Sequence, residues 1–292
     1  MGDGDIVRSV VSRSVRRLAA SACVVSTILV SVTMDAQIPF SAVADSAKLA
    51  PPADARITYG SAPQQFAELR APAGRGPHPV VMLIHGGCWR AAYDVAHVAG
   101  LAEALRKEGF ATWTIEYRRV GDEGGGDPGT FDDIRAAYDA LIANAKAHAL
   151  DPKRVILSGH SAGGHLALWL AAEPSVEARG VVSLAGITDL ASYVAPTGCG
   201  SAVPLLLGGS AAEKPDAYAA RSPVTRAKPV MPVTLLLADS DQIVPRSQAD
   251  AYLARFPGTA VVTVPGGHFD LVAPWSAAFP ALLGAFKHTM GR

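Results

Sequence analysis

The chain has 292 residues, of which 49% are hydrophobic and 18% charged, a composition that allows one large buried core. Its 26 lysines and arginines balance 26 aspartates and glutamates, so neither nucleic acid nor an anionic membrane surface is expected as a partner. The eight histidines and three cysteines show no spacing that is typical of a metal site, and we expect neither a metal nor another cofactor.

Residues 1–44 are predicted to be a signal peptide or an uncleaved signal anchor. Four arginines precede an apolar run over residues 18–32, which is too short for a comfortable membrane span. The Ala-Val-Ala sequence at 42–44 provides a cleavage site, and residues 34–36 provide a closer but poorer one. We therefore expect a periplasmic or secreted protein, and an uncleaved N-terminal segment is the only membrane contact that the sequence predicts.

Residues 45–55 are predicted to be a linker, and residues 56–290 a single domain. In this domain, four short apolar runs rich in β-branched residues predict buried parallel strands: 79–84, 154–158, 233–238 and 260–264. Helical patterns alternate with these strands, which favours an α/β fold with a mostly parallel, doubly wound sheet. Residues 187–230 interrupt the alternation with frequent proline and glycine, which predicts either a lid-like insertion or an inert surface excursion.

The sequence Gly-His-Ser-Ala-Gly at 159–163 lies where a predicted strand runs directly into a predicted helix. A serine on so sharp a turn holds its hydroxyl above the sheet, and the flanking glycines let the strand and helix backbones approach closely. The pattern predicts that Ser161 is a catalytic nucleophile. The alternative is a serine that only caps the helix, and such a serine needs no partner residues elsewhere in the chain.

A second pattern, His85-Gly86-Gly87, follows the first of these predicted strands. When a serine attacks a carbonyl group, the carbonyl oxygen becomes negative and has to be met by preorganised N–H donors. The backbone amides of Gly86 and Gly87 and that of Ala162 are the predicted donors of this oxyanion hole. The alternative is an ordinary glycine-rich turn between a strand and a helix.

Candidate acid and base residues follow the last two predicted strands. Asp239 and Asp241 come after the first of these strands, and His268 comes after the second. Because the carboxyl ends of parallel strands meet at one edge of a sheet, we expect these side chains to lie near Ser161. His268 would then take the proton of the serine, and one aspartate would fix the imidazole tautomer.

Together these motifs resemble those of the α/β-hydrolase superfamily, in its esterase and arylformamidase branch, which is related to hormone-sensitive-lipase-type enzymes. The chain order serine, aspartate, histidine is that of this fold. The His-Gly-Gly-x-Trp sequence at 85–89 is similar to an element of kynurenine formamidases, and residues 159–164 are similar to the nucleophile turn of the branch. The Asp-x-x-Val-Pro sequence at 241–245 is similar to the acid loop of the branch and favours Asp241 over Asp239. Cys88 stands where the lipase-type motif has a third glycine, so the resemblance does not extend to lipase-like substrates.

The walls of the substrate pocket are predicted from residues beside these motifs: Cys88, Trp89, Tyr93 and His160. Cys88 and Cys199 are the two cysteines outside the signal segment, and in an exported protein they can form a disulfide between the lid and the oxyanion loop. An unpaired Cys88 that lines the pocket is the alternative.

The sequence therefore predicts a serine hydrolase that cleaves a small carboxylic ester or aryl amide through an acyl-enzyme, with Ser161, His268 and Asp241 as the catalytic triad. Two other interpretations remain open from the sequence. One is a serine peptidase similar to prolyl oligopeptidases, and the other is a catalytically silent binding protein on a hydrolase scaffold. The acyl group, the leaving group and the oligomeric state do not follow from the sequence.

Overall fold

The computed structural model describes residues 37–193 and 199–292, so nearly all of the predicted signal segment lies outside the described residues. All described residues belong to one compact unit, which contains the sheet and its helices. None of the described helices is long and apolar enough to cross a membrane.

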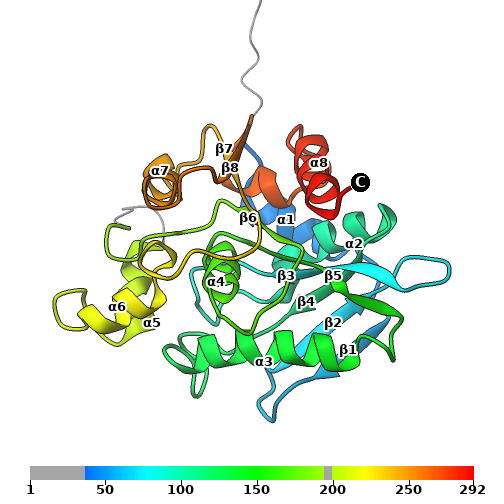
Figure 1. Ribbon diagram of the computed structural model, residues 1–292, viewed down its shortest axis with the longest axis horizontal. Coiled ribbons are helices and arrows are strands. Elements are labelled where there is room, and N and C mark those ends of the chain that lie inside the picture. Colours follow the sequence, from blue (N-terminus) through cyan, green and yellow to red (C-terminus); the bar gives the residue numbers. More distant parts are fainter. Residues whose placement is uncertain (1–36, 194–198) are drawn as a thin grey trace, which may run out of the picture. The chain divides into compact units, whose positions relative to one another are not determined.

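An eight-stranded sheet runs through this unit in the order β1-β2-β4-β3-β5-β6-β7-β8 (Figure 1). Its strands are β1 (Ala55–Thr58), β2 (Phe66–Arg70), β3 (His78–Ile84), β4 (Ala111–Ile115), β5 (Leu150–His160), β6 (Gly180–Leu184), β7 (Val233–Ala238) and β8 (Ala260–Val264). The pairs β1–β2 and β2–β4 are antiparallel, and all the others are parallel. The predicted mostly parallel sheet is confirmed.

Helices cover both faces of this sheet, with α3 and α4 on one face and α2 and α8 on the other (Figure 1). The helices are α1 (Phe40–Ala47), α2 (Ala99–Lys107), α3 (Gly129–Asn144), α4 (Ala162–Ala171), α5 (Val203–Leu207), α6 (Pro215–Arg221), α7 (Arg246–Arg255) and α8 (Phe279–Met290). Four 3₁₀ turns complete the described elements: η1 (Val95–Val98), η2 (Gly200–Ala202), η3 (Pro223–Thr225) and η4 (His268–Val272). The arrangement is the predicted double winding.

The centre of the sheet explains why the sequence reads as continuous apolar runs there. Between its two neighbours, β3 has five consecutive residues with no exposed surface: Val80, Val81, Met82, Leu83 and Ile84. A strand covered on both faces has no polar side, and each such side chain contributes about 1.5–3 kcal/mol on burial. This rigid centre holds the loops that follow β3 and β5.

Helix α1 differs from the predicted organisation, because it crosses the expected boundary between the signal segment (1–44) and the linker (45–55). It spans Phe40–Ala47 and packs on the domain, with Val43 only 2% exposed. Phe40 and Val43 are three residues apart and therefore share one face of the helix, which the small residues around them concealed in the sequence. Residues 45–47 are thus helix and not linker. Removal of a signal peptide stays a prediction.

Residues 187–230 contain only short helical elements in their described part, namely η2, α5, α6 and η3, while residues 194–198 lie outside the described part. Prolines stand in the first turns of α5 and α6, where a helix tolerates them because the missing N–H has no helical acceptor there. Cys199 and Ser201 of this segment reach the cavity described below. The insertion therefore contributes to that cavity.

Candidate active site

The residues singled out in the sequence come together at one edge of the sheet. Ile84 at the end of β3 pairs with Gly159 of β5, and Ala238 at the end of β7 pairs with Val264 at the end of β8. The loops that follow these strands carry the oxyanion glycines, Ser161, the two aspartates and His268. They meet where ligands bind in open parallel sheets, at the carboxyl ends of the strands.

Ser161 lies in a strained turn between β5 and α4, with φ 56° and ψ −118°. The turn is possible because of its glycines: a Cβ at Gly159 would lie 2.3 Å from the carbonyl oxygen of Gly163, and one at Gly163 would lie 2.1 Å from that of Ile84. This backbone conformation destabilises the folded state by about 1–3 kcal/mol, and such strain is found mainly at functional sites. The turn also places the N–H of Ala162 at the N-terminus of α4, where the helix dipole favours negative charge.

His268 is paired with Asp241 and not with Asp239. Its Nδ1 lies 2.7 Å from Asp241 Oδ2, and both side chains are about 5% exposed. The other carboxylate oxygen of Asp241 accepts the N–H groups of Ile243 (2.8 Å) and Val244 (2.9 Å), which fixes its orientation. Nδ1 therefore carries the proton, and Nε2 of His268 is left as the accepting nitrogen.

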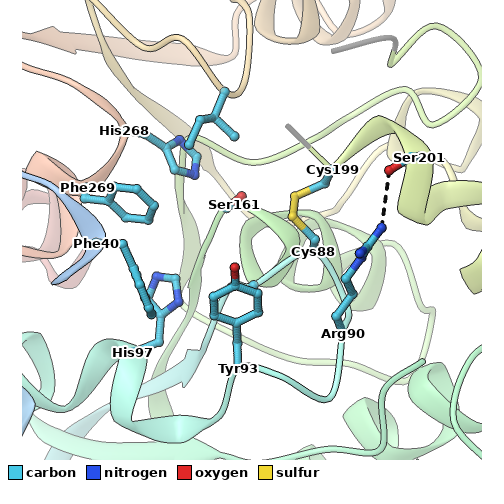
Figure 2. A pocket seen from close by; sticks show the side chains of 12 residues that line it. Phe40, Cys88, Arg90, Tyr93, His97, Ser161, Cys199, Ser201, His268 and Phe269 are labelled. Carbon is cyan, nitrogen blue, oxygen red and sulfur yellow. Dashed lines mark hydrogen bonds between the residues drawn. A yellow bond between two sulfur atoms is a disulfide. The ribbon is translucent and has the colours of Figure 1, made fainter. Parts of the chain in front are cut away.

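Ser161 and His268 face the same cavity, which has a volume of about 300 Å³ (Figure 2). Within the described part of the chain, the serine hydroxyl makes no hydrogen bond with the imidazole. Such bonds are often long in enzymes without substrate and tighten when substrate binds. The arrangement can therefore place an accepting nitrogen beside the serine once a substrate fills the cavity.

The oxyanion loop is oriented by His85, whose Nδ1 donates to the carbonyl oxygen of Gly86 at 2.7 Å. Because C=O and N–H point in opposite directions across a trans peptide, the N–H of Gly87 points away from His85. Gly87 has φ +109°, and a Cβ there would lie 2.3 Å from the Cβ of Tyr93, so no other residue fits. Gly87 itself lines the cavity beside Ser161.

A buried carboxylate, Glu116, supports His85 and was missed in the sequence. It lies 3.0 Å from His85 Nε2 and 2.9 Å from the guanidinium of Arg119, and it accepts the N–H of Val95 at 2.8 Å. Burial raises the pKa of Glu116, but the neighbouring His85 and Arg119 outweigh it and hold that pKa below its usual range. The only signal in the sequence is an acidic residue directly after a buried strand, followed by two arginines.

Two further histidines form a hydrogen-bonded chain behind His268. His160 Nε2 lies 2.9 Å from the carbonyl oxygen of His268, and His97 Nε2 lies 3.0 Å from His160 Nδ1. A carbonyl only accepts, so His160 donates through Nε2 and accepts from His97 through Nδ1. Burial, helped by neighbouring imidazoles, lowers the pKa of His97 to about 3 and that of His160 well below its ordinary value. Both rings are neutral, and His160 holds the backbone of His268.

The cavity walls agree only in part with the predicted pocket. Cys88 and Tyr93 line the cavity, whereas Trp89 and His160 do not and have no exposed surface. Left-handed φ values of 55° at Cys88 and 53° at Trp89 turn the chain, so that the Trp89 indole lies in the core and donates to His165 at 3.2 Å. The prediction for Trp89 and His160 was therefore wrong. Lining residues that the sequence did not suggest are Phe40, Arg90, His97, Ser201, Ile243 and Phe269.

A disulfide joins Cys88 to Cys199, with 4.9 Å between the Cα atoms, which is within the usual range. It connects the oxyanion loop to the insertion, the pairing that the sequence left open. Figure 2 shows the disulfide and Arg90 on one side of Ser161, with Phe40, His97 and Phe269 on the other. Arg90 donates to the Ser201 hydroxyl at 3.2 Å. The described residues contain no group of three or more histidine, cysteine or acidic side chains able to hold a metal ion.

Comparison with known families gives a match to the model of the BD-FAE family over residues 69–255. A probable isoprenylcysteine alpha-carbonyl methylesterase of Oryza sativa subsp. japonica is 28% identical over 145 residues, which are 49% of this chain and 33% of that protein. An isoprenylcysteine alpha-carbonyl methylesterase of Arabidopsis thaliana is 30% identical over 112 residues, 38% of this chain and 26% of that protein. The matches thus span a third or less of these relatives.

Among solved structures, esterase B from Lactobacillus Rhamnosis has a TM-score of 0.72 at 19% identity, covering 86% of this chain and 91% of that one. A truncated carbohydrate esterase from gut microbiota has a TM-score of 0.71 at 20% identity, covering 83% and 98%. A bacterial heroin esterase has a TM-score of 0.66 at 21% identity, covering 89% and 95%. These likenesses confirm the α/β-hydrolase fold that the motifs implied.

Proposed function

Because this chain belongs to the BD-FAE family, within the α/β-hydrolase esterases, we propose that it hydrolyses small carboxylic esters through an acyl-enzyme on Ser161. The observation that carries the proposal is the 2.7 Å contact of His268 with Asp241, at the cavity that also holds the strained serine. A binding protein needs neither an aspartate–histidine pair nor a strained serine at its cavity, so these residues favour an enzyme over a catalytically silent scaffold.

In the proposed reaction Ser161 Oγ attacks the ester carbonyl carbon while His268 Nε2 takes the hydroxyl proton. Asp241 holds the imidazole in the accepting tautomer and stabilises the imidazolium that forms. The carbonyl oxygen becomes negative and is met by the N–H groups of Gly87 and Ala162, with Gly86 as the further candidate donor. Removal of one such donor typically lowers kcat by a factor of about 10²–10³.

The tetrahedral intermediate then collapses and expels the alcohol, which receives the proton from His268. In the second half of the reaction, a water molecule attacks the acyl carbon while His268 Nε2 takes one of its protons. The second tetrahedral intermediate then collapses, the bond from the acyl carbon to Ser161 Oγ breaks, the carboxylic acid is released, and His268 returns the proton to Ser161 Oγ. The cavity volume of about 300 Å³ limits the substrate to a small molecule. The resemblance at residues 85–89 makes an aryl amide the second candidate class.

The proposal is tested with p-nitrophenyl acetate and butyrate beside N-formylkynurenine and a dipeptidyl anilide. We expect ester turnover and stoichiometric labelling of Ser161 by an alkyl phosphonate. Ser161→Ala and His268→Ala should each lower kcat at least about 10³-fold, and the double variant should lose little more, since the residues act as a unit. Near-normal turnover by folded Ser161→Ala would overturn the mechanism.

We also propose that the protein is exported. The basic and apolar sequence before residue 33 supports export, and so does the Cys88–Cys199 disulfide, because such bonds persist in oxidising compartments. Cell fractionation of the native host tests this proposal, and recovery of the enzyme with the cytoplasmic markers would contradict it.

A further inference from the structure

Helix α1 lies before the first strand of the sheet, yet it reaches the cavity through Phe40. We infer that Phe40 is a specificity-determining residue, which limits the size of the substrate group bound beside Ser161. The inference rests on the proposed esterase function. It makes the segment 37–47 a wall of the substrate site.

Two hydrogen bonds attach this segment to the loops that carry the acid and the base. The N–H of Ile38 donates to Asp270 Oδ2 at 3.2 Å, and Gln37 Nε2 donates to the carbonyl oxygen of Ser240 at 2.8 Å. Asp270 Oδ2 also accepts the N–H of Gly267 at 2.9 Å. The segment is therefore held at the residues next to His268 and Asp241.

The helix itself is seated by packing. Val43 is 2% exposed, and α1 contacts η1, α2 and η4. The two helices are close at Gly100 of α2, where a Cβ would lie 3.0 Å from the Ser46 hydroxyl. A helix fixed along its length presents a rigid side chain to the cavity, and rigidity is what a size limit requires.

The Phe40 ring closes the aromatic side of the cavity. Its centroid lies 5.3 Å from that of Tyr93, 5.4 Å from that of His97 and 5.5 Å from that of Phe269. These distances are typical of packed aromatic pairs. In Figure 2 the ring stands on the side of Ser161 opposite the disulfide, which is itself covalently fixed. A substrate group on the aromatic side is therefore bounded by a wall that includes Phe40.

The same contacts bear on the processing of the chain. Cleavage after Ala44 would remove Phe40, Val43 and both hydrogen-bond donors that attach the segment. A signal peptidase that leaves this wall intact has to cut at or before Ala36, which favours residues 34–36 over residues 42–44 as the cleavage site.

The test compares Phe40→Ala and Phe40→Leu with the matched control Leu49→Ala, whose side chain is 84% exposed just beyond α1. Two substrate series separate the two parts of an ester: p-nitrophenyl acetate against p-nitrophenyl benzoate, and methyl acetate against benzyl acetate. For Phe40→Ala we expect the kcat/KM ratio of bulky to small ester to rise at least about tenfold in one series. Phe40→Leu should change in the same direction by less, and Leu49→Ala should not change.

The series that responds identifies the substrate group that Phe40 faces. Unchanged ratios in both series, in variants that still hydrolyse p-nitrophenyl acetate, would overturn the inference alone. Absence of ester turnover in the unmodified protein would overturn the proposed function as well. If Phe40→Ala does not fold, Phe40→Leu carries the test. N-terminal sequencing of the protein from its native host should give a chain that begins at or before Gln37, and a fully active chain beginning at Asp45 would refute the wall.

Discussion

Replacement of Asp241 by asparagine removes one charge and one acceptor while keeping nearly the same shape. Asp241 Oδ1 accepts two loop N–H groups, from Ile243 and Val244, and its Oδ2 faces His268 Nδ1 at 2.7 Å. Asparagine has one accepting oxygen and one donating NH₂ group. It keeps the two loop bonds only if its oxygen replaces Oδ1, which turns the NH₂ group toward His268.

An NH₂ group that faces Nδ1 forces this nitrogen to accept, so the imidazole proton moves to Nε2. Nε2 then has no lone pair to take the proton of Ser161. The equivalent replacement in a serine protease lowers kcat about 10⁴-fold, or about 5.5 kcal/mol at 1.36 kcal/mol per factor of ten. We expect Asp241→Asn to lower kcat by about 10³–10⁴ for the same reason.

Asp239→Asn is the matched control, two residues away in the same loop. Its Oδ1 accepts the Ser240 hydroxyl at 2.9 Å and the N–H of Gly266 at 3.2 Å, so it stabilises a turn. We expect less than about a threefold change in kcat. The assay is p-nitrophenyl acetate turnover per phosphonate-titrated site, with circular dichroism to confirm folding. A greater loss in Asp239→Asn, or an Asp241→Asn variant within tenfold of the native enzyme, would refute the tautomer argument.

Three other predictions concern residues that hold the candidate active site in place: His85, the Cys88–Cys199 disulfide and the buried histidines. His85→Phe should lower kcat about 10–100-fold with little change in KM, because the Gly87 donor loses its orientation; an unchanged kcat in steady-state kinetics would contradict this. A Cys88→Ser/Cys199→Ser variant should lose about 2–4 kcal/mol of unfolding free energy, because the disulfide closes a long loop; equal urea midpoints would show otherwise. Acidification from pH 7 to pH 5 should lower the unfolding free energy. Below about pH 6.5 His97 and His160 bind protons in the unfolded chain but stay neutral in the folded one, so each residue lowers the unfolding free energy by about 1.4 kcal/mol per pH unit. His97→Gln should flatten this dependence in urea titrations, and an unchanged slope would argue against a buried neutral ring.

The central sheet and the meeting of Ser161, Asp241 and His268 at one edge of it could be predicted, because each rests on a local pattern. An apolar β-branched run favours a strand, and Ser161, Asp241 and His268 each follow such a run at the strand's carboxyl end. The prediction that 260–264 is buried was wrong, because β8 is an edge strand and only Val264 of it is buried. The convergence of these strand ends is a property of parallel sheets, so no knowledge of side-chain packing was needed.

The supporting residues depend on contacts between distant segments and left little trace in the sequence. His160 holds a carbonyl 108 residues away, and the Gln37 side chain binds a carbonyl 203 residues away. The position of Trp89 beside the glycines predicts a pocket residue, but left-handed φ values at Cys88 and Trp89 turn its side chain into the core. The hydrophobic periodicity of the sequence predicts neither the direction of a side chain in a loop nor a hydrogen-bond partner so distant in the chain.

Cys88 and Cys199 are 111 residues apart in the sequence, and β4, α3, β5, α4 and β6 all lie within the covalent loop that their bond closes. Ser161 and its helix lie inside the loop as well, whereas Asp241 and His268 lie outside it. A protease that cuts the backbone anywhere between the two cysteines therefore leaves the two fragments joined as one covalent molecule. A nicked enzyme of this kind would keep its mobility on a non-reducing gel and separate into two bands only after reduction, so intact mass under reducing conditions is the sound criterion of purity for kinetic work.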